Sequence, residues 1–249
     1  PAGTGALTLS RDSLRDMIAR TQFAITGEDT RYFLNGALLV LHSNSMSLVA
    51  TDGHRLALVS VDRPASGGDE ELKVILPKKT LLELAKLLGE GSGDIVYERG
   101  ENHLFFTVGT RVLVSRMIDG QFPAYERVIP KGNDKQIDFE RERLTSAVKR
   151  VALLSNERSR AVKLEIAKGK VEVTSSSSEF GEAREQLAVE YAGPALTISF
   201  NAQYVLDFLN VVDTDVVSLS LKDEVSQAVM KPVGSTTGDY TYVIMPMRI

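Results

Sequence analysis

The 249-residue sequence contains no cysteine, no tryptophan and only three histidines. Without cysteine, the chain cannot form disulfides, thiolate metal sites or a cysteine nucleophile. His42, His54 and His103 show no His-x-x-x-His spacing. Because zinc needs three or four converging ligands, we expect no metal site, and no other motif indicates a cofactor.

Long apolar runs and a strong basic excess are also lacking. No run approaches the roughly 18 residues of a membrane span, and the N-terminal PAGTGALTLSRDSL has no basic head before an apolar block. We therefore expect neither a membrane anchor nor a signal peptide. The net charge of −4 argues against an ordinary nucleic-acid binder, although residues 140–160 carry six basic and three acidic side chains. A helix face with such a basic excess is either simply exposed to solvent or binds along the phosphates of a nucleic acid.

The length allows two domains, and 43% apolar with 25% charged residues is the balance of a folded globular protein. Helical spacing of apolar residues predicts four helices, in segments 9–25, 77–91, 139–154 and 200–212. Short apolar or alternating runs predict strands at 37–42, 45–50, 55–61, 72–76, 94–98, 103–108, 111–116, 161–167, 170–175, 184–191, 216–221, 226–232 and 240–247.

The order of helices and strands repeats. Arg11, Leu14 and Ile18 match Arg141, Leu144 and Val148 at an offset of 130 residues. Helices on one side of antiparallel sheets make an α+β fold, with two helices in each half. Segment 119–136 has two prolines and no periodicity, so we expect domains at 1–121 and 137–249, joined by a linker at 122–136.

One short stretch, TDGHRLA at 51–57, has two readings. As a turn, Asp52 and Gly53 supply the geometry, and Leu56 and Ala57 re-enter a strand. As a hydrolase site, Asp52 and His54 would join a serine from 43–45 or 174–178, but no nucleophile elbow is present and the i, i+2 spacing aligns poorly. We favour the turn.

Six segments together resemble the bacterial sliding clamp, the β subunit of the replicative DNA polymerase. They are RYFLNG (31–36), ATDGHRLA (50–57), DGQFPAYERVIP (119–130), LLSNERSRAVKL (153–164), FNAQYVLDFLN (200–210) and the C-terminal YVIMPMRI. The resemblance implies two copies of the clamp domain, the middle and C-terminal domains of a three-domain subunit. It implies a non-catalytic processivity factor in the bacterial cytoplasm.

The resemblance also implies partners. A full-length clamp is a homodimeric ring around duplex DNA, which it holds without sequence specificity. DNA polymerases, the clamp loader and other proteins bind it through a linear, glutamine-containing motif with hydrophobic residues. Because the family's N-terminal domain has no counterpart here, we expect a monomer. The alternative function is peptide binding alone, without encircling DNA.

By matching motifs, the resemblance assigns a peptide pocket between the two domains. Its members would be Leu34, Thr51, Gly53, His54, Arg55, Leu56, Pro123, Arg127, Val128, Asn201, Tyr204, Val225, Val243, Ile244, Met245, Pro246, Met247 and Arg248. The DNA-facing residues would be Tyr32, Phe33, Lys78, Lys79, Arg20 and Arg160. Ser159 departs from the pattern, since some relatives carry an aromatic residue at this edge of the pocket.

Overall fold

The computed structural model describes residues 5–65, 71–89, 91–234 and 238–248. Its contacts divide the chain into two compact units. Unit 1 comprises Pro1–Tyr125 and Thr237–Tyr240, and unit 2 comprises Glu126–Thr236 and Thr241–Ile249. The division at Tyr125 lies within the segment 122–136 that we expected to be a linker.

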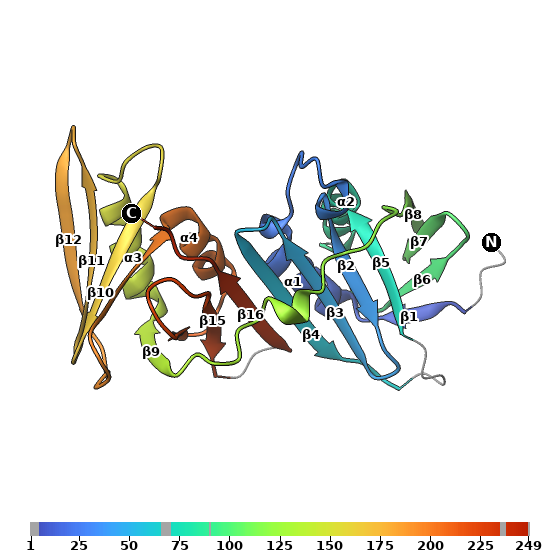
Figure 1. Cartoon of the computed structure of the whole chain (residues 1–249). Coiled ribbons are helices and arrows are strands. Elements are labelled where there is room, and N and C mark those ends of the chain that lie inside the picture. The colour runs from blue at the N-terminus through green and yellow to red at the C-terminus, as the bar shows by residue number, and fades with distance from the viewer. Residues whose placement is uncertain (1–4, 66–70, 90, 235–237, 249) are drawn as a thin grey trace. The chain divides into compact units, whose positions relative to one another are not determined.

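Unit 1 contains two helices and two antiparallel sets of strands (Figure 1). In chain order its elements are β1 (Leu7–Leu9), α1 (Arg11–Thr21), η1 (Gln22–Ala24), η2 (Tyr32–Leu34), β2 (Gly36–Leu41), β3 (Ser45–Thr51), β4 (Arg55–Asp62), β5 (Leu72–Pro77), α2 (Lys78–Leu88), β6 (Ile95–Arg99), β7 (His103–Val108) and β8 (Arg111–Arg116). The strands pair in the orders β5-β2-β3-β4 and β1-β6-β7-β8. The two helices pack against each other, α1 also against β3 and β4, and α2 against β5 and β7.

Unit 2 follows the short 3-10 helix η3 (Tyr125–Arg127) and has the same plan. Its elements are β9 (Lys135–Glu140), α3 (Arg141–Ala152), β10 (Ala161–Ala167), β11 (Lys170–Ser177), β12 (Gly181–Ala188), β13 (Leu196–Asn201), α4 (Ala202–Val211), β14 (Val216–Leu221), β15 (Ala228–Val233) and β16 (Asp239–Ile244), whose first two residues, Asp239 and Tyr240, belong to unit 1. The strands pair in the orders β12-β11-β10-β13 and β9-β14-β15-β16. Helix α3 packs against β10, β11 and β12, and α4 packs against α3 and β13.

The repeat predicted from the sequence is therefore a repeat of topology. Helices α1 and α3 begin at Arg11 and Arg141, which are 130 residues apart. The two arginines also make equivalent bonds to the loop that follows the second helix. Arg11 Nη1 donates to the Ser92 carbonyl at 3.1 Å, and Arg141 Nε donates to the Thr214 carbonyl at 2.9 Å. Each unit closes its own fold in the same way.

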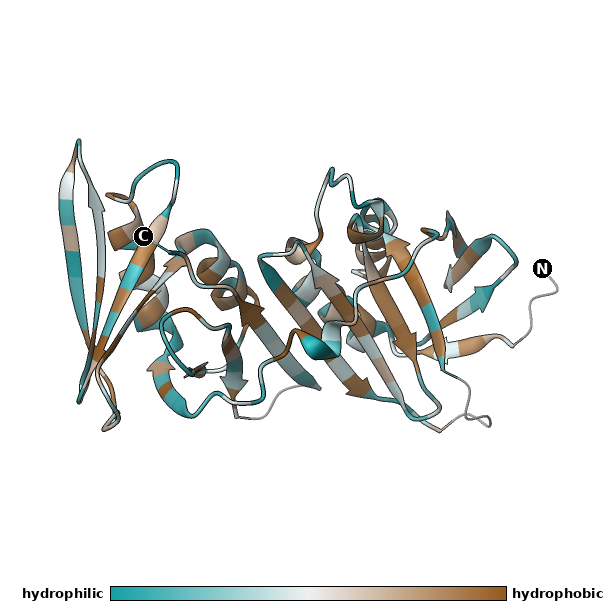
Figure 2. Cartoon of the chain, viewed as in Figure 1, coloured by the Kyte–Doolittle hydropathy of each residue, from teal (hydrophilic) through white to brown (hydrophobic). Residues whose placement is uncertain are grey.

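The helices form where local signals and burial agree. Ser10 caps α1 by accepting a hydrogen bond from the Ser13 N–H, and Leu14, Met17 and Ile18 turn one buried stripe toward the strands. Figure 2 shows hydrophobic residues along β2 and β5, whereas β12 carries hydrophilic segments. This agrees with the burial of every residue of β2 and with the alternating exposure of β12.

The strand prediction missed three strands and overran two, β12, which ends at Ala188 rather than Tyr191, and β16. β1 has only three residues, and β9 lies across the boundary that we set between linker and second domain. β13 runs directly into α4, so its apolar residues were taken as part of the helix or left unassigned. β16 ends at Ile244 rather than Met247, because the chain leaves the strand before Pro246.

Candidate functional site

The turn between β3 and β4 is held by its own polar groups. The Asp52 carboxylate accepts hydrogen bonds from the backbone N–H groups of His54 (2.9 Å) and Arg55 (3.1 Å). The Thr51 hydroxyl donates to the Arg55 carbonyl (2.7 Å) and accepts from the Gly53 N–H (3.2 Å). Gly53 has φ +87°, a conformation that favours glycine. The turn reading is correct, and it exposes Gly53 and His54.

Arg55 braces this turn against the segment after α1. Its Nε donates to Asp52 Oδ2 at 3.1 Å and its Nη2 to the Phe23 carbonyl at 3.0 Å, with the guanidinium 5.4 Å from the Phe23 ring centroid. Both oxygens of Asp52 are thus engaged by Arg55 and by the backbone. The carboxylate does not orient His54 as a hydrolase triad would require, which argues against the hydrolase reading.

A second arginine lies beside the same turn. Arg31 forms two side-chain hydrogen bonds to Asp29, at 3.0 and 2.8 Å, and its backbone N–H donates to the same carboxylate at 2.8 Å. These bonds lower the pKa of Asp29 to about 2. A Cβ placed at Gly53 would lie 3.3 Å from Arg31 Nη2, so the small residue makes room for this guanidinium.

The C-terminal segment of unit 2 is partly packed and partly exposed. Val243 and Ile244 are buried where β16 pairs with β15. Beyond the strand, the Met247 N–H donates to the Ser199 carbonyl at 2.7 Å, which ties the last residues to β13. Met245 and Arg248 are exposed, and Met247 is half-buried. An apolar end therefore remains accessible on a fixed backbone.

The start of α4 lies at the end of β13, the strand to which the C-terminal segment is tied. Asn201 caps the helix by accepting from the N–H groups of Gln203 (2.9 Å) and Tyr204 (3.4 Å). The Tyr242 hydroxyl donates to the Tyr204 carbonyl at 2.8 Å, and the Tyr242 ring stacks on Phe208 with centroids 5.3 Å apart. These contacts fix the half-buried Tyr204 in position.

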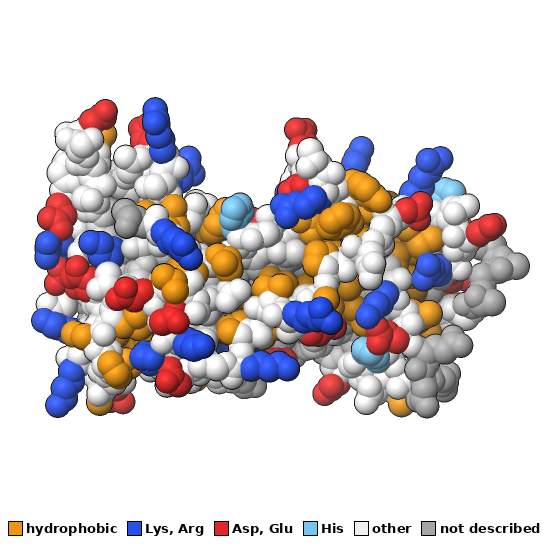
Figure 3. Space-filling model, viewed as in Figure 1, with side chains coloured by type: hydrophobic (Ala, Val, Ile, Leu, Met, Phe, Trp, Pro, Cys, Tyr) orange, Lys and Arg blue, Asp and Glu red, His pale blue; other side chains and the backbone are white. Residues whose placement is uncertain are grey.

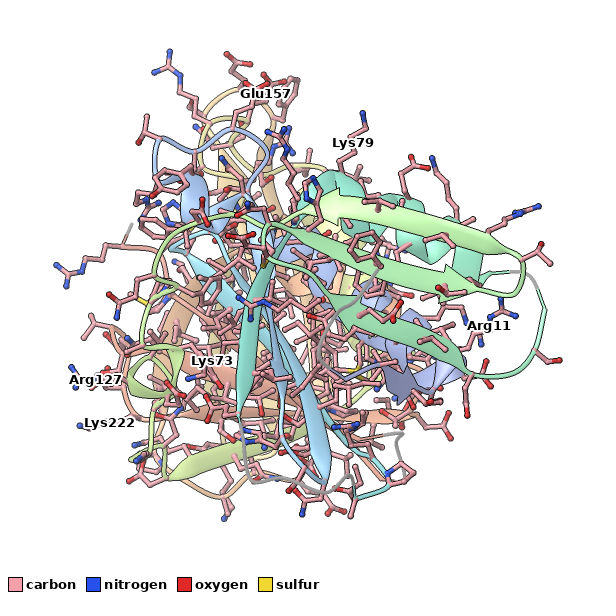
Figure 4. All side chains as sticks on the ribbon, turned by 90° about the vertical axis from the view of Figure 1, so that its right-hand side faces the viewer. Arg11, Lys73, Lys79, Arg127, Glu157 and Lys222 are labelled. Atoms are coloured by element: carbon pink, nitrogen blue, oxygen red, sulfur yellow. The ribbon has the colours of Figure 1, made fainter. Side chains whose placement is uncertain are left out.

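The other predicted peptide-binding residues differ in accessibility. Val225 is exposed on a loop that Asp223 orders by accepting from the N–H groups of Val225 (2.9 Å) and Ser226 (2.7 Å). The hydrogen bond from the Ser226 hydroxyl, followed by the two backbone bonds, lowers the pKa of Asp223. Arg127 is exposed and points away from the chain (Figure 4). Half-buried members are Pro123, Val128 and Pro246; buried members are Leu34, Thr51 and Leu56.

Three of the predicted DNA-facing residues are exposed in the structure. Tyr32 and Arg160 are exposed, and Lys79 extends outward from α2 (Figure 4). Phe33 is half-buried and packs edge to face on Tyr32, with centroids 5.8 Å apart. Figure 3 shows basic and acidic side chains mixed over the face that it draws, with no large basic area.

Two of the other residues predicted to face DNA make contacts within the fold. Arg20 is only 7% exposed, and its guanidinium lies 5.8 Å from the ring centroid of Tyr240, a residue of the same unit. Its charge is used inside the fold. Lys78 is half-buried and donates its ammonium group to the Ile25 carbonyl at 3.2 Å, so it also has a structural partner.

Sequence reasoning missed exposed apolar residues in unit 2, and two of them stand out. Leu153 directly follows α3 and is 81% exposed, and Phe180 lies in the β11–β12 turn and is 64% exposed. The signal for Phe180 was an aromatic residue beside Gly181, in a turn that joins two strands.

Two negative findings concern the part of the chain that the structure describes. No group of three or more histidine, aspartate or glutamate side chains there could hold a metal ion. No helix within it is long and apolar enough to cross a membrane.

Comparison with known proteins gives one family for both units. The family model described as "DNA polymerase III beta subunit, central domain" matches residues 8–124, and the one described as "DNA polymerase III beta subunit, C-terminal domain" matches residues 126–248. The beta sliding clamp of Pseudomonas putida is 43% identical over 249 residues, which cover 99% of this chain and 67% of the relative. The chain belongs to the bacterial β sliding clamp family.

Solved sliding clamps have the same fold as this chain. A crystal structure of the DNA polymerase sliding clamp from Pseudomonas aeruginosa is 39% identical, has a TM-score of 0.95, and covers all of this chain and 68% of that clamp. Another Pseudomonas aeruginosa clamp, with a TM-score of 0.93 and 39% identity, is bound to griselimycin, and this chain covers 67% of it. The resemblance found in the sequence and the prediction of two α+β clamp domains are confirmed.

Proposed function

We propose that this chain is the part of a bacterial sliding clamp that holds DNA polymerases and other replication or repair proteins by a linear peptide motif. The observation that carries the proposal is a 39% identical solved clamp that covers the whole chain at a TM-score of 0.95. Tethering raises the local concentration of a bound polymerase to about the millimolar range, so processivity rises without bond chemistry in the clamp. We place this activity in the bacterial cytoplasm.

We assign peptide binding to two surfaces, one in each unit. In unit 1 it is the exposed turn at Gly53 and His54, whose backbone is fixed by Asp52 and Arg55. In unit 2 it is the C-terminal segment with Met245 and Met247, beside the capped start of α4. Methionine side chains adapt to varied apolar partners, and rigid surroundings limit the entropy lost on binding. The other predicted members Leu34, Leu56, Val243 and Ile244 are buried within their units.

Fluorescence polarisation with a labelled, glutamine-containing motif peptide tests the assignment. We expect binding by the intact chain, competition by griselimycin, and a loss of about tenfold in affinity for Met247→Ala, whose thioether would anchor an apolar side chain. Leu153→Ala is the matched control, because Leu153 is an exposed apolar residue of the same unit outside the assigned surface. If both variants bind as the parent does, the C-terminal segment is not the peptide-binding surface.

Binding to DNA is the second part of the proposal. Lys79, Arg160 and Tyr32 would contact the backbone or stacked bases of duplex DNA without reading its sequence. The chain spans 67% of the length of the Pseudomonas putida relative, so peptide binding alone is a distinct second function. Retention on nicked circular DNA during gel filtration separates the two: release of the circle while peptide still binds supports the peptide-only function.

Assembly and catalysis have their own tests. We expect this chain to be a monomer, which light scattering would measure directly as a mass near 27.2 kDa. We also expect no nuclease or esterase turnover, from either the parent or His54→Ala. Turnover in the parent that is lost in His54→Ala would support the hydrolase reading instead.

A further inference from the structure

An open pocket of about 430 Å³ lies in unit 2 between the segment after α3 and the β11–β12 turn. Its lining is dominated by hydroxyl, amide and ammonium groups, from Asn156, Ser159, Lys163, Thr174, Ser176 and Ser178. Glu157, which neighbours Asn156, marks this segment in Figure 4. The matching segment 153–164 contributes Asn156, Ser159 and Lys163 to this pocket, but the peptide-binding residues assigned above include none of its lining.

The pocket is continuous with the assigned peptide surface through the strands of one sheet. Lys163 of β10 lies opposite Ser199 of β13 and opposite Thr174 of β11. Residues directly opposite each other in antiparallel strands project from the same face, so these three side chains form one row. Ser199 is also the residue whose carbonyl holds Met247. Lys163 is thus one strand away from the residue that anchors the C-terminal segment.

The charges of the pocket favour an acidic ligand. Glu182 also lines it, but its carboxylate is paired with Arg184 at 2.7 Å, and Arg184 bonds Glu172 at 2.7 Å as well. Lys163, in contrast, forms no ion pair within the described ranges of the chain. A lysine ammonium surrounded by groups that can donate hydrogen bonds matches a carboxylate.

Asn156 adds a donor at the rim of the pocket. Its side-chain oxygen accepts from the N–H groups of Arg158 (2.9 Å) and Ser159 (3.4 Å). With the oxygen so engaged, the amide NH₂ group is left to donate to a ligand. The hydroxyls of Ser176 and Ser178, both on exposed residues, can do the same.

We propose that this pocket binds an acidic side chain that flanks the linear motif of a partner, and that Lys163 determines this preference. The inference rests on the proposed peptide-binding function and deepens it, because it adds a contact outside the motif itself. Continuity with the C-terminal segment gives the occupant: the same partner peptide, extended past its motif across β13 and β10.

Polarisation measurements with matched peptides test the proposal. One peptide carries the glutamine-containing motif alone; others add a glutamate three or four residues before or after it, or a glutamine at the same place. We expect one glutamate peptide to bind about three- to fivefold more tightly than its glutamine counterpart, the size typical of a partly exposed ion pair. Lys163→Gln should abolish this difference.

The control variant is Lys168→Gln, which removes the same charge from the exposed β10–β11 turn. It should keep the full preference for glutamate. A second variant, Ser176→Asp, places a carboxylate in the pocket and should also abolish the preference, which guards against a folding defect in Lys163→Gln.

The outcomes separate this inference from the proposed function. Absence of binding by the motif peptide alone would overturn the proposed function. Binding of that peptide with no preference for glutamate on either side would overturn only the acidic-flank inference. An equal loss of preference in Lys163→Gln and Lys168→Gln would also overturn it, because the effect would then be long-range charge rather than the pocket.

Discussion

Asn201 is expected to contribute both to stability and to peptide binding, and substitutions can separate the two. Its side chain accepts from two N–H groups at the start of α4, at 2.9 and 3.4 Å. Asn201→Ala removes this cap and should lower the free energy of unfolding by about 1 kcal/mol, or the melting temperature by roughly 4 °C. Asn201→Asp keeps an acceptor at the same place, so it should retain nearly all of the stability.

The binding measurement then isolates the amide group of Asn201. If its NH₂ group donates to a bound peptide, Asn201→Asp should bind several-fold more weakly although it is stable. Ser10→Ala is the control, because Ser10 caps α1 in the other unit by accepting from the Ser13 N–H at 3.3 Å. It should lose stability but keep its affinity for the peptide. The reasoning is refuted if Asn201→Asp is as unstable as Asn201→Ala in circular dichroism melts.

Three further predictions concern the fold. Gly36→Ala should destabilise unit 1 by about 3 kcal/mol in urea unfolding, because its Cβ would lie against a backbone carbonyl of β5; Gly132→Ala, with nothing within 4 Å, should change stability by less than about 0.5 kcal/mol. Arg141→Ala should lower stability by about 1.5 kcal/mol, since a charged donor leaves the loop carbonyl at 2.9 Å; an unchanged urea midpoint would contradict this. Asp29 should titrate near pH 2 by NMR, and the stability that its bonds to Arg31 contribute should be present at neutral pH and be lost as the pH falls from 3.8 to about 2; a midpoint at the ordinary 3.8 would exclude these bonds.

Local patterns in the sequence predicted the helices and most of the strands. The four helices carry apolar residues at helical spacing. Helix α1 starts at Arg11 after the cap Ser10, α2 starts at Lys78 after Pro77, and α3 starts at Arg141, the residue that the repeat aligns with Arg11. The turn at Asp52 and Gly53 was predictable because its geometry is set by neighbours in the sequence.

The features that local patterns could not predict have a common physical origin in contacts between distant residues. Arg20 was predicted to face DNA because Tyr240, whose ring lies over its guanidinium, is far from it in the sequence. Arg55 braces its turn through Phe23, which is 32 residues away. The pocket at Lys163 depends on the register of three strands, and a shift by one residue would turn Lys163 to the other face.

The pairing of the first strand of each unit with a late one has a consequence for biosynthesis. In unit 1, Leu7 lies opposite Tyr97, and in unit 2, Glu140 lies opposite Val216. A ribosome must therefore release most of a unit before its opening strand finds its neighbour. Until then β1 or β9 remains without its strand partner on the nascent chain, where chaperones bind. The duplicated topology thus exposes the emerging polypeptide twice, once for each unit.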